Sequence, residues 1–310
     1  MKNYYRLMLG KKSTYAEACH ADGFIGADFG IPQSLAPQLG HDRRAFNAAL
    51  IPVYLTAHPD KTKIAAGLAC GALFSICAAM QLGDIVLRPD GAGAGRYLVG
   101  EIAGGYSYAP NDILPHRRAI RWLNTAIDRP QMTEALRNSC GSINTLSDIT
   151  DYAAEIDRLI AGAATAGSNR SSDETTDPTG FAFEKHLEDF LVRNWPQVAL
   201  AKDFDIFAED GEQVGQQYPT DTGPMDLLCI SKDQKTLLVV ELKRGRASDA
   251  VVGQVLRYMG YVQAELAEPG QTVKGVIIAL EDDPRMQRAL AMVPNISFYR
   301  YEISFRLMKA

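Results

Sequence analysis

The segment Thr236–Arg246, with the sequence TLLVVELKRGR, limits the possible folds more than any other part of the chain. Its four consecutive apolar residues, Leu237 to Val240, are typical of a strand that is buried on both faces. Two opposite charges follow, at Glu241 and Lys243. Because residues two apart on a strand face the same side of a sheet, an acid and a base stand side by side where this strand ends.

The sequence around this strand predicts a mixed sheet with helices packed on it. The segment FAFEKHLEDFLVRNW has apolar residues at helical spacing, and the turn KDQK separates two strand-like segments, which predicts a hairpin. We expect helices over 181–195 and 248–266, and strands over 203–210, 224–231, 236–246, 273–281 and 296–307. This order is typical of a mixed α/β (α+β) domain.

A change of composition divides the chain in two. The segment AGAATAGSNRSSDETTDPTG is small, polar and without periodicity, which is typical of a linker. We predict an N-terminal domain over 1–160, a flexible linker over 161–178 and a C-terminal domain over 179–310, and a length of 310 residues suits two domains. Short strands with glycine-rich turns and an alanine-rich helix predict that the N-terminal domain is a small β-barrel with helices.

The composition excludes several classes of protein. The net charge is −5, so binding to nucleic acid would depend on local basic patches. The five cysteines are widely spaced and form no CxxC, which argues against a disulfide framework and a structural zinc site and predicts a cytoplasmic protein. No apolar run is long enough to cross a bilayer, so we expect no membrane partner.

A second acid belongs with the charged pair. Asp226 lies just inside the preceding strand, so the predicted hairpin brings it close to Glu241. Two converging carboxylates repel each other unless a cation lies between them, and Mg²⁺ suits a site with one or two carboxylates and several waters. Lys243 could then position the attacking water or stabilise charge on a phosphate. These residues predict phosphodiester hydrolysis with Mg²⁺, for which Mn²⁺ is expected to substitute.

The acids and the Glu-Leu-Lys motif resemble the PD-(D/E)XK nuclease fold. The segment GPMDLLCISKDQKTLLVVELKRGRASDAVVGQVLRYMGYV is similar to the C-terminal nuclease domain of NucS-type endonucleases, and more distantly to Mrr-type restriction enzymes. The likeness covers most of 179–310 and includes a Gln-x-x-x-Tyr pattern at Gln254 and Tyr258. The family has proline before its first acid, whereas Met225 precedes Asp226 here.

The resemblance implies both a catalytic set and a metal-binding set. The catalytic set is Glu184, Asp226, Glu241, Lys243 and Gln254, and the metal ligands are Asp226, Glu241 and an acid from the first helix. Glu184 and Glu188 are both available for that helix position. We expect Glu184, because it lies nearer the apolar face of the helical wheel while Glu188 points further toward solvent. The alternative is that both acids only solvate the helix.

Residues outside this set are expected to bind DNA. Arg244 and Arg246 follow the motif and are predicted to contact phosphates. The N-terminal part resembles PUA/EVE-like domains in its strand order, in the GDIV segment and in a His-Arg-Arg-x-x-x-Trp pattern. Members of that group read modified bases, which implies further phosphate contacts at Arg117, Arg118 and Arg121.

A base that leaves the stack needs a pocket with aromatic walls and a few polar groups. The candidate pocket residues are Phe24, Asp28, Phe29, Tyr106, Tyr108 and Trp122. Asp28 could accept hydrogen bonds from an exocyclic amine. The alternative for the aromatic residues is that they form the core of a small barrel.

Together these features predict a Mg²⁺-dependent DNA endonuclease that restricts modified foreign DNA, such as phage DNA. Its partner would be double-stranded DNA that carries a modified base. Because one active site cuts one strand, a homodimer or a transient dimer on DNA is expected. One alternative is a repair nuclease that acts on mismatched or branched DNA. Another is a catalytically inactive binding scaffold, but the intact Asp226, Glu241 and Lys243 argue against it.

Overall fold

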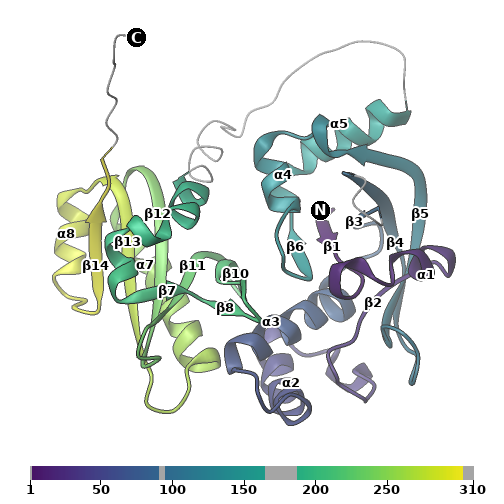
Figure 1. The fold of residues 1–310 in the computed structure, drawn as a ribbon, viewed down its shortest axis with the longest axis horizontal. Coiled ribbons are helices and arrows are strands. Elements are labelled where there is room, and N and C mark those ends of the chain that lie inside the picture. The colour runs from purple at the N-terminus through teal and green to yellow at the C-terminus, as the bar shows by residue number, and fades with distance from the viewer. Residues whose placement is uncertain (1, 91–94, 165–186, 303–310) are drawn as a thin grey trace. The chain divides into compact units, whose positions relative to one another are not determined.

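The computed structural model describes residues 2–90, 95–164 and 187–302. The chain divides into two compact units, Met1–Glu174 and Thr175–Ala310 (Figure 1). The predicted linker began at residue 161, but helix α5 continues to Ala164, so its first four residues are helical. The rest of the predicted linker, 165–178, lies outside the described residues.

The N-terminal unit is built on a six-stranded mixed sheet with the order β2-β5-β4-β3-β1-β6. Strands β1 and β3 are parallel, and the other neighbours are antiparallel. The two long strands, β4 and β5, curve across the unit as part of a half-barrel (Figure 1). The strands are β1 (Tyr4–Leu7), β2 (Phe24–Ala27), β3 (Ile85–Pro89), β4 (Arg96–Tyr108), β5 (His116–Asp128) and β6 (Leu146–Asp148).

Helices cover both faces of this sheet, because alternate residues of its strands are apolar on both sides. On β3, Val86 packs in a core with α2 and α3, while Ile85 and Leu87 pack in a second core with α4 and α5. Helices α2 and α3 begin with side-chain caps from Asp42 and Thr62. The helices are α1 (Ala16–Ala21), α2 (Arg43–Ala57), α3 (Lys63–Phe74), α4 (Glu134–Cys140) and α5 (Ala153–Ala164).

The C-terminal unit contains a mixed sheet with the order β10-β11-β12-β13-β14, and β7 pairs with β11. The predicted hairpin is present, since β11 and β12 are antiparallel and joined by the KDQK turn. Strands β12, β13 and β14 are parallel and need crossover connections, which include α7 and α8. The strands are β7 (Phe204–Ile206), β8 (Ala208–Glu209), β9 (Glu212–Gln213), β10 (Gln216–Thr220), β11 (Gly223–Ser231), β12 (Thr236–Arg246), β13 (Thr272–Glu281) and β14 (Ile296–Arg300).

The helices of this unit are α7 (Asp249–Tyr261) and α8 (Pro284–Leu290), and residues 187–193 are also helical. Short 3-10 or π-helical turns complete both units: η1 (Lys11–Ser13), η2 (Ala36–Gln38), η3 (Ser75–Ala79), η4 (Arg129–Gln131), η5 (Thr150–Tyr152), η6 (Trp195–Gln197), η7 (Ala199–Lys202) and η8 (Val262–Leu266). No helix in the described ranges is both long and apolar enough to cross a membrane.

Helix α7 packs closely on β13 because Gly275 has no side chain there. A Cβ atom at this position would lie 2.6 Å from Cγ1 of Val255 and 2.8 Å from Sδ of Met259, both on α7. Gly275 pairs with Val239, so α7 covers the face of the sheet on which Val239 and Glu241 lie. The spacing at Gly275 therefore fixes the height of α7 above the end of β12.

We predict that Gly275→Ala destabilises the protein by about 1–3 kcal/mol, because the added methyl group forces α7 away from the sheet. Gly260→Ala is the control, since a Cβ atom at this exposed position of α7 meets no atom within 4 Å. The control is expected to stabilise the helix by about 0.5–1 kcal/mol. Denaturant unfolding measures both. Equal stability of the two variants would show that the contact at Gly275 does not set the position of α7.

Candidate active site

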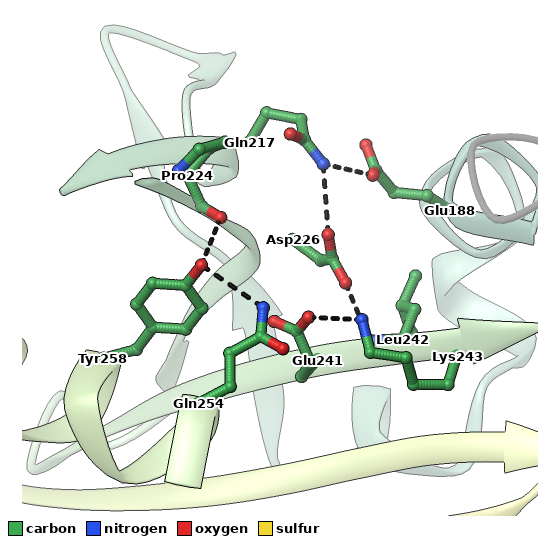
Figure 2. A network of polar contacts seen from close by, with 9 residues as sticks. All are labelled: Glu188, Gln217, Pro224, Asp226, Glu241, Leu242, Lys243, Gln254 and Tyr258. Atoms are coloured by element: carbon green, nitrogen blue, oxygen red, sulfur yellow. Dashed lines mark hydrogen bonds and ion pairs between the residues drawn. The ribbon is translucent and has the colours of Figure 1, made fainter. Parts of the chain in front are cut away.

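The β11–β12 hairpin brings the two predicted acids together. Leu227 pairs with Val240, so Asp226 and Glu241 occupy the next opposed positions on the same face of the sheet. One carboxylate oxygen of Asp226, Oδ2, accepts a hydrogen bond from the backbone N–H of Leu242 at 2.7 Å (Figure 2). The carboxylate of Asp226 is thus fixed to the backbone of the strand that carries the second acid.

Glu241 and Lys243 form an ion pair at the place where β12 leaves the core. The Nζ atom of Lys243 lies 2.9 Å from Oε1 of Glu241 (Figure 2). The side chain of Glu241 is 2% exposed and that of Lys243 is 28% exposed. The ammonium group is therefore held by a buried carboxylate and remains within reach of a ligand from solvent.

Glu188, one of the two candidate helix acids, lies next to this site. It is buried, and Oε2 accepts a hydrogen bond from Nε2 of Gln217, which also donates to Oδ1 of Asp226 at 3.2 Å (Figure 2). The prediction that Glu188 points toward solvent was wrong, because the helical wheel does not include β10, whose Gln216 and Gln217 cover this carboxylate. Glu184, the preferred acid, lies outside the described residues.

Two residues of α7 anchor this helix to the acid-bearing strand. The hydroxyl of Tyr258 donates a hydrogen bond to the carbonyl of Pro224 at 2.9 Å, two residues before Asp226. Nε2 of Gln254 in turn donates to the hydroxyl of Tyr258 at 3.4 Å (Figure 2). Burial raises the pKa of Tyr258, and the negative charges of Glu241 and Asp226 raise it further. The hydroxyl therefore stays protonated and acts as a donor.

The carboxyl of Asp226 has a pKa well above its ordinary value of 3.8. Burial is the largest cause, followed by repulsion from Glu241 and Glu188, while the N–H of Leu242 and the charge of Lys243 oppose the shift. Such a concentration of negative charge is unfavourable without a cation. The raised pKa therefore fits a site that binds a positive ion.

The donor set also fits a hard divalent cation. It consists of carboxylate oxygens from Asp226 and Glu241, with Glu188 next to Asp226, and carboxylates suit Mg²⁺ and Mn²⁺. Within the described part of the chain, no group of three or more His, Cys, Asp or Glu side chains is placed so that it could hold a metal ion. Mg²⁺ needs only one or two carboxylates, because it keeps several of its waters.

The two arginines after the motif lie at an irregularity of β12, Arg244 inside it and Arg246 at its end. The pairing with β13 shifts between Lys243 and Arg246, and both Arg244 and Arg246 are exposed. Arg246 forms an ion pair with Glu281 at 3.3 Å, and the carbonyl of Arg244 accepts a hydrogen bond from the hydroxyl of Tyr301. Their exposure is compatible with the predicted phosphate contacts, which stay predictions.

The arginines of β5 have different environments. Arg118 is buried, and its guanidinium donates to the carbonyls of Gly104 at 2.8 Å and Met80 at 3.0 Å. It connects β5 to β4 and to the end of η3, so its prediction as a phosphate contact was wrong. Strand alternation turns this residue toward the core. The side chain of Arg121, by contrast, is 64% exposed and pairs with Glu101.

Arg117 is half-buried. Its Nη2 atom lies 2.8 Å from Oδ2 of Asp112, and its Cζ atom lies 4.0 Å from the centre of the ring of Phe24. Phe24 is 6% exposed, so this aromatic face is covered by the guanidinium. Arg117 and Phe24 thus form a cation–π contact. The prediction that Phe24 forms a wall for a bound base was therefore wrong, because the guanidinium of Arg117 already covers its ring.

The other predicted pocket residues fall into separate groups. The hydroxyl of Tyr106 lies 3.1 Å from Nδ1 of His116, and the rings of Tyr108 and His116 stack at 5.2 Å. Trp122 stacks on His20 at the same distance. The remaining two candidates, Asp28 and Phe29, lie in the loop after β2. Asp28 is exposed and accepts a hydrogen bond from the backbone N–H of Gly30. Phe29 is half-buried and packs against the core that contains α2 and α3.

Sequence reasoning missed Gln216 and Gln217. Both amides donate to Glu188, at 2.6 Å from Nε2 of Gln216 and at a shorter distance from Gln217. The available signal was the pair of glutamines in a strand-like segment just before the strand of Asp226. Recognising it required the β10–β11 pairing, which places the segment opposite that strand.

The pKa of Asp226 generates a prediction for the metal-free protein. A pKa raised by folding contributes stability that is complete below the unfolded pKa and is lost as the pH rises through the folded pKa. At about pH 8, Asp226→Asn should therefore raise the Tm in EDTA, and the gain should shrink toward about pH 4. Thermal unfolding measures this.

Asp205→Asn, at an exposed position of β7, is the control and should change the Tm little at either pH. If Asp226→Asn lowers the Tm across the whole pH range, the repulsion inferred between the acids is absent.

Two family models match parts of this chain. Residues 185–304 match the family described as the endonuclease NucS C-terminal domain, and residues 56–150 match a domain of unknown function, DUF8426. No curated protein sequence matches the chain.

Three solved structures are similar to the chain. A repair endonuclease from Pyrococcus abyssi has 15% identity and a TM-score of 0.31, with coverage of 68% of this chain and 64% of that one. An EndoMS complex with double-stranded DNA has 15% identity and a TM-score of 0.32, with coverage of 72% and 66%. The MspJI restriction endonuclease with an oligonucleotide has 12% identity and a TM-score of 0.22, with coverage of 83% and 62%.

The chain thus spans less than two thirds of the length of each of these structures. The family match coincides with the unit that holds Asp226, Glu241 and Lys243 at one end of its sheet, as the resemblance implied. Over residues 185–304, the C-terminal unit is similar to the C-terminal domain of the endonuclease NucS.

Proposed function

We propose that this protein is a DNA endonuclease that depends on Mg²⁺ and accepts Mn²⁺. The observation that carries the proposal is the hairpin end at which Asp226, Glu241 and Lys243 meet inside a NucS-like domain. Two acids and a lysine at such a place can bind a cation and a phosphate together. Burying these charged groups destabilises the fold, and an inactive scaffold would gain nothing from them in return.

Asp226 and Glu241 would hold the cation, and Glu188 would support it from the neighbouring helix. The ion supplies positive charge that activates water and offsets the charge that develops on the scissile phosphate. Lys243 is proposed to act as a hydrogen-bond donor. Its ammonium, fixed on Glu241, donates a hydrogen bond to the attacking water or to a phosphate oxygen from the open side of the site.

The anchor formed by Gln254 and Tyr258 keeps α7 in place over this face of the sheet. Gln254, one helical turn before Tyr258, is proposed to contact the substrate or its water through its amide. Arg244 and Arg246 would hold the DNA backbone next to the cleaved bond, since guanidinium groups match the geometry of phosphate oxygens.

We predict that Asp226→Ala and Glu241→Ala each lower the cleavage rate at least about a hundredfold and remove metal binding. Lys243→Ala should lower the rate by about 10²–10³-fold and keep metal binding, because it removes a charge that stabilises the transition state. A nicking assay measures the rates, and the metal-induced rise in Tm reports binding. Asp205→Ala, at an exposed strand position, is the control and should cut like the wild type. Wild-type cleavage by Asp226→Ala would contradict the assigned site.

We further propose that the N-terminal unit selects a modified base and that the protein restricts modified DNA, such as phage DNA. The support is a division of chemistry, because the nuclease site offers groups for phosphate and the N-terminal unit offers aromatic and polar groups for a base. A dimer, or a transient dimer on DNA, would place one site on each strand. The second candidate is repair of mismatched or branched DNA, which the match to a NucS-type domain favours.

Binding experiments with the full-length Asp226→Asn variant separate the two roles, because DNA is then not cut. We predict at least about tenfold tighter binding, at constant salt, to a duplex with a methylated or hydroxymethylated base than to an unmodified one. Phe29→Ala, in the loop after β2, should remove the preference. Tyr15→Ala, an exposed aromatic residue, is the control and should retain it. A preference for mismatched or branched DNA instead would replace the restriction role with repair.

A further inference from the structure

Gln217 has an unusual backbone for a strand residue. Its φ is +50°, in the left-handed region, although its neighbours Gln216 and Tyr218 pair regularly with β11. This region is unfavourable for residues with a side chain other than asparagine or aspartate, and it persists where surrounding contacts require it. The contacts at Gln217 are made by its amide group, which lies among the acids of the active site.

The amide of Gln217 bridges two carboxylates that repel each other. Nε2 donates to Oε2 of Glu188 and, at 3.2 Å, to Oδ1 of Asp226 (Figure 2). The other oxygen of Asp226 accepts from the backbone N–H of Leu242. A primary amide has two N–H groups, so one nitrogen can serve both carboxylates at once. The positive end of the amide dipole therefore lies between the two negative charges.

A divalent cation and this NH₂ group would compete for Oδ1 of Asp226. An N–H group directed at a cation is unfavourable, whereas a carbonyl oxygen is a suitable ligand for Mg²⁺ and Mn²⁺. Rotation of the amide about its last carbon–carbon bond exchanges its nitrogen and its oxygen within the same volume. Gln217 can thus act as a donor without metal and as an oxygen ligand with metal.

We propose that Gln217 is a residue of the metal site, which keeps Glu188 and Asp226 together in the metal-free protein and gives its carbonyl oxygen to the bound cation. This inference rests on the proposed function, because it assumes that Asp226 binds metal. The proposal accounts for the left-handed backbone conformation of Gln217 in β10, next to the strand of Asp226. The strain orients the amide toward the acids.

The neighbouring Gln216 provides a matched comparison. Its amide also donates to Glu188, at 2.6 Å, but its second contact is Asp189, at 3.2 Å, and not Asp226. Loss of Gln216 therefore tests the hydrogen bonds that hold Glu188, without a direct effect on Asp226. Loss of Gln217 tests that support together with the contact to the metal-binding acid.

The experiment measures the affinity of the full-length protein for Mn²⁺ and Mg²⁺ by calorimetry without DNA. Gln217→Gly removes the amide and suits the positive φ, so the fold should be retained. We expect it to weaken metal affinity by about 10–100-fold, and Gln216→Ala to have a clearly smaller effect. Gln217→Glu should restore most of the affinity, because it returns an oxygen ligand of the same length, while it lowers the Tm in EDTA by adding a fourth acid to Asp226, Glu241 and Glu188.

Equal losses in Gln217→Gly and Gln216→Ala would limit both residues to the support of Glu188 and would overturn the proposal. Unchanged affinity in Gln217→Gly would overturn it as well, and so would a Gln217→Glu variant that fails to restore binding. Wild-type protein and Asp226→Asn are measured alongside. If the wild type binds no metal, the proposed function itself fails; if it binds and Asp226→Asn does not, a negative result for Gln217 concerns this inference alone.

Discussion

The repulsion between carboxylates at the end of the β11–β12 hairpin is the constraint on which the rest of the nuclease unit depends. Asp226 and Glu241 are opposed across the hairpin, and Glu188 approaches from a helix. Each is held by its own donor: the backbone N–H of Leu242 and the ammonium of Lys243, both on β12, and the side-chain amides of β10. Folding therefore collects negative charge at one point, and the N–H groups around it offset part of the repulsion that a bound cation would also offset.

Helix α7 makes both apolar and polar contacts with the sheet that carries these acids. Gly275 lets α7 lie close to the sheet, and Tyr258 attaches the same helix to the strand of Asp226. A change far from the acids on β13 can therefore move Gln254 relative to the site. Packing and chemistry are joined here because one helix serves both as the cover of the core and as the support of polar groups.

The N-terminal unit uses several of its polar and aromatic residues for its own stability. Asp84, 1% exposed, accepts from the N–H groups of Asn3 and Gln81, which fixes the turn before β3 to the start of the chain. Arg118 satisfies carbonyls at the end of η3. The aspartate of the GDIV segment, Asp84, therefore has a structural role. Among the residues predicted to contact DNA in this unit, Asp28 in the loop after β2 and Arg121 on β5 are exposed.

The sequence by itself determined the hairpin, the buried strand of β12, the proximity of Asp226 to Glu241 and Lys243, and the similarity of the C-terminal unit to the NucS C-terminal domain. Those features follow from local rules, since periodicity and a short turn fix which residues share a face. Tertiary structure decided that Glu188 is buried beside Asp226, that Gln217 bridges these two acids, and that Arg118 and Phe24 make contacts inside the N-terminal unit. These depend on which strand covers which helix and on the curvature of a long sheet, and both are set by contacts between residues far apart in the chain.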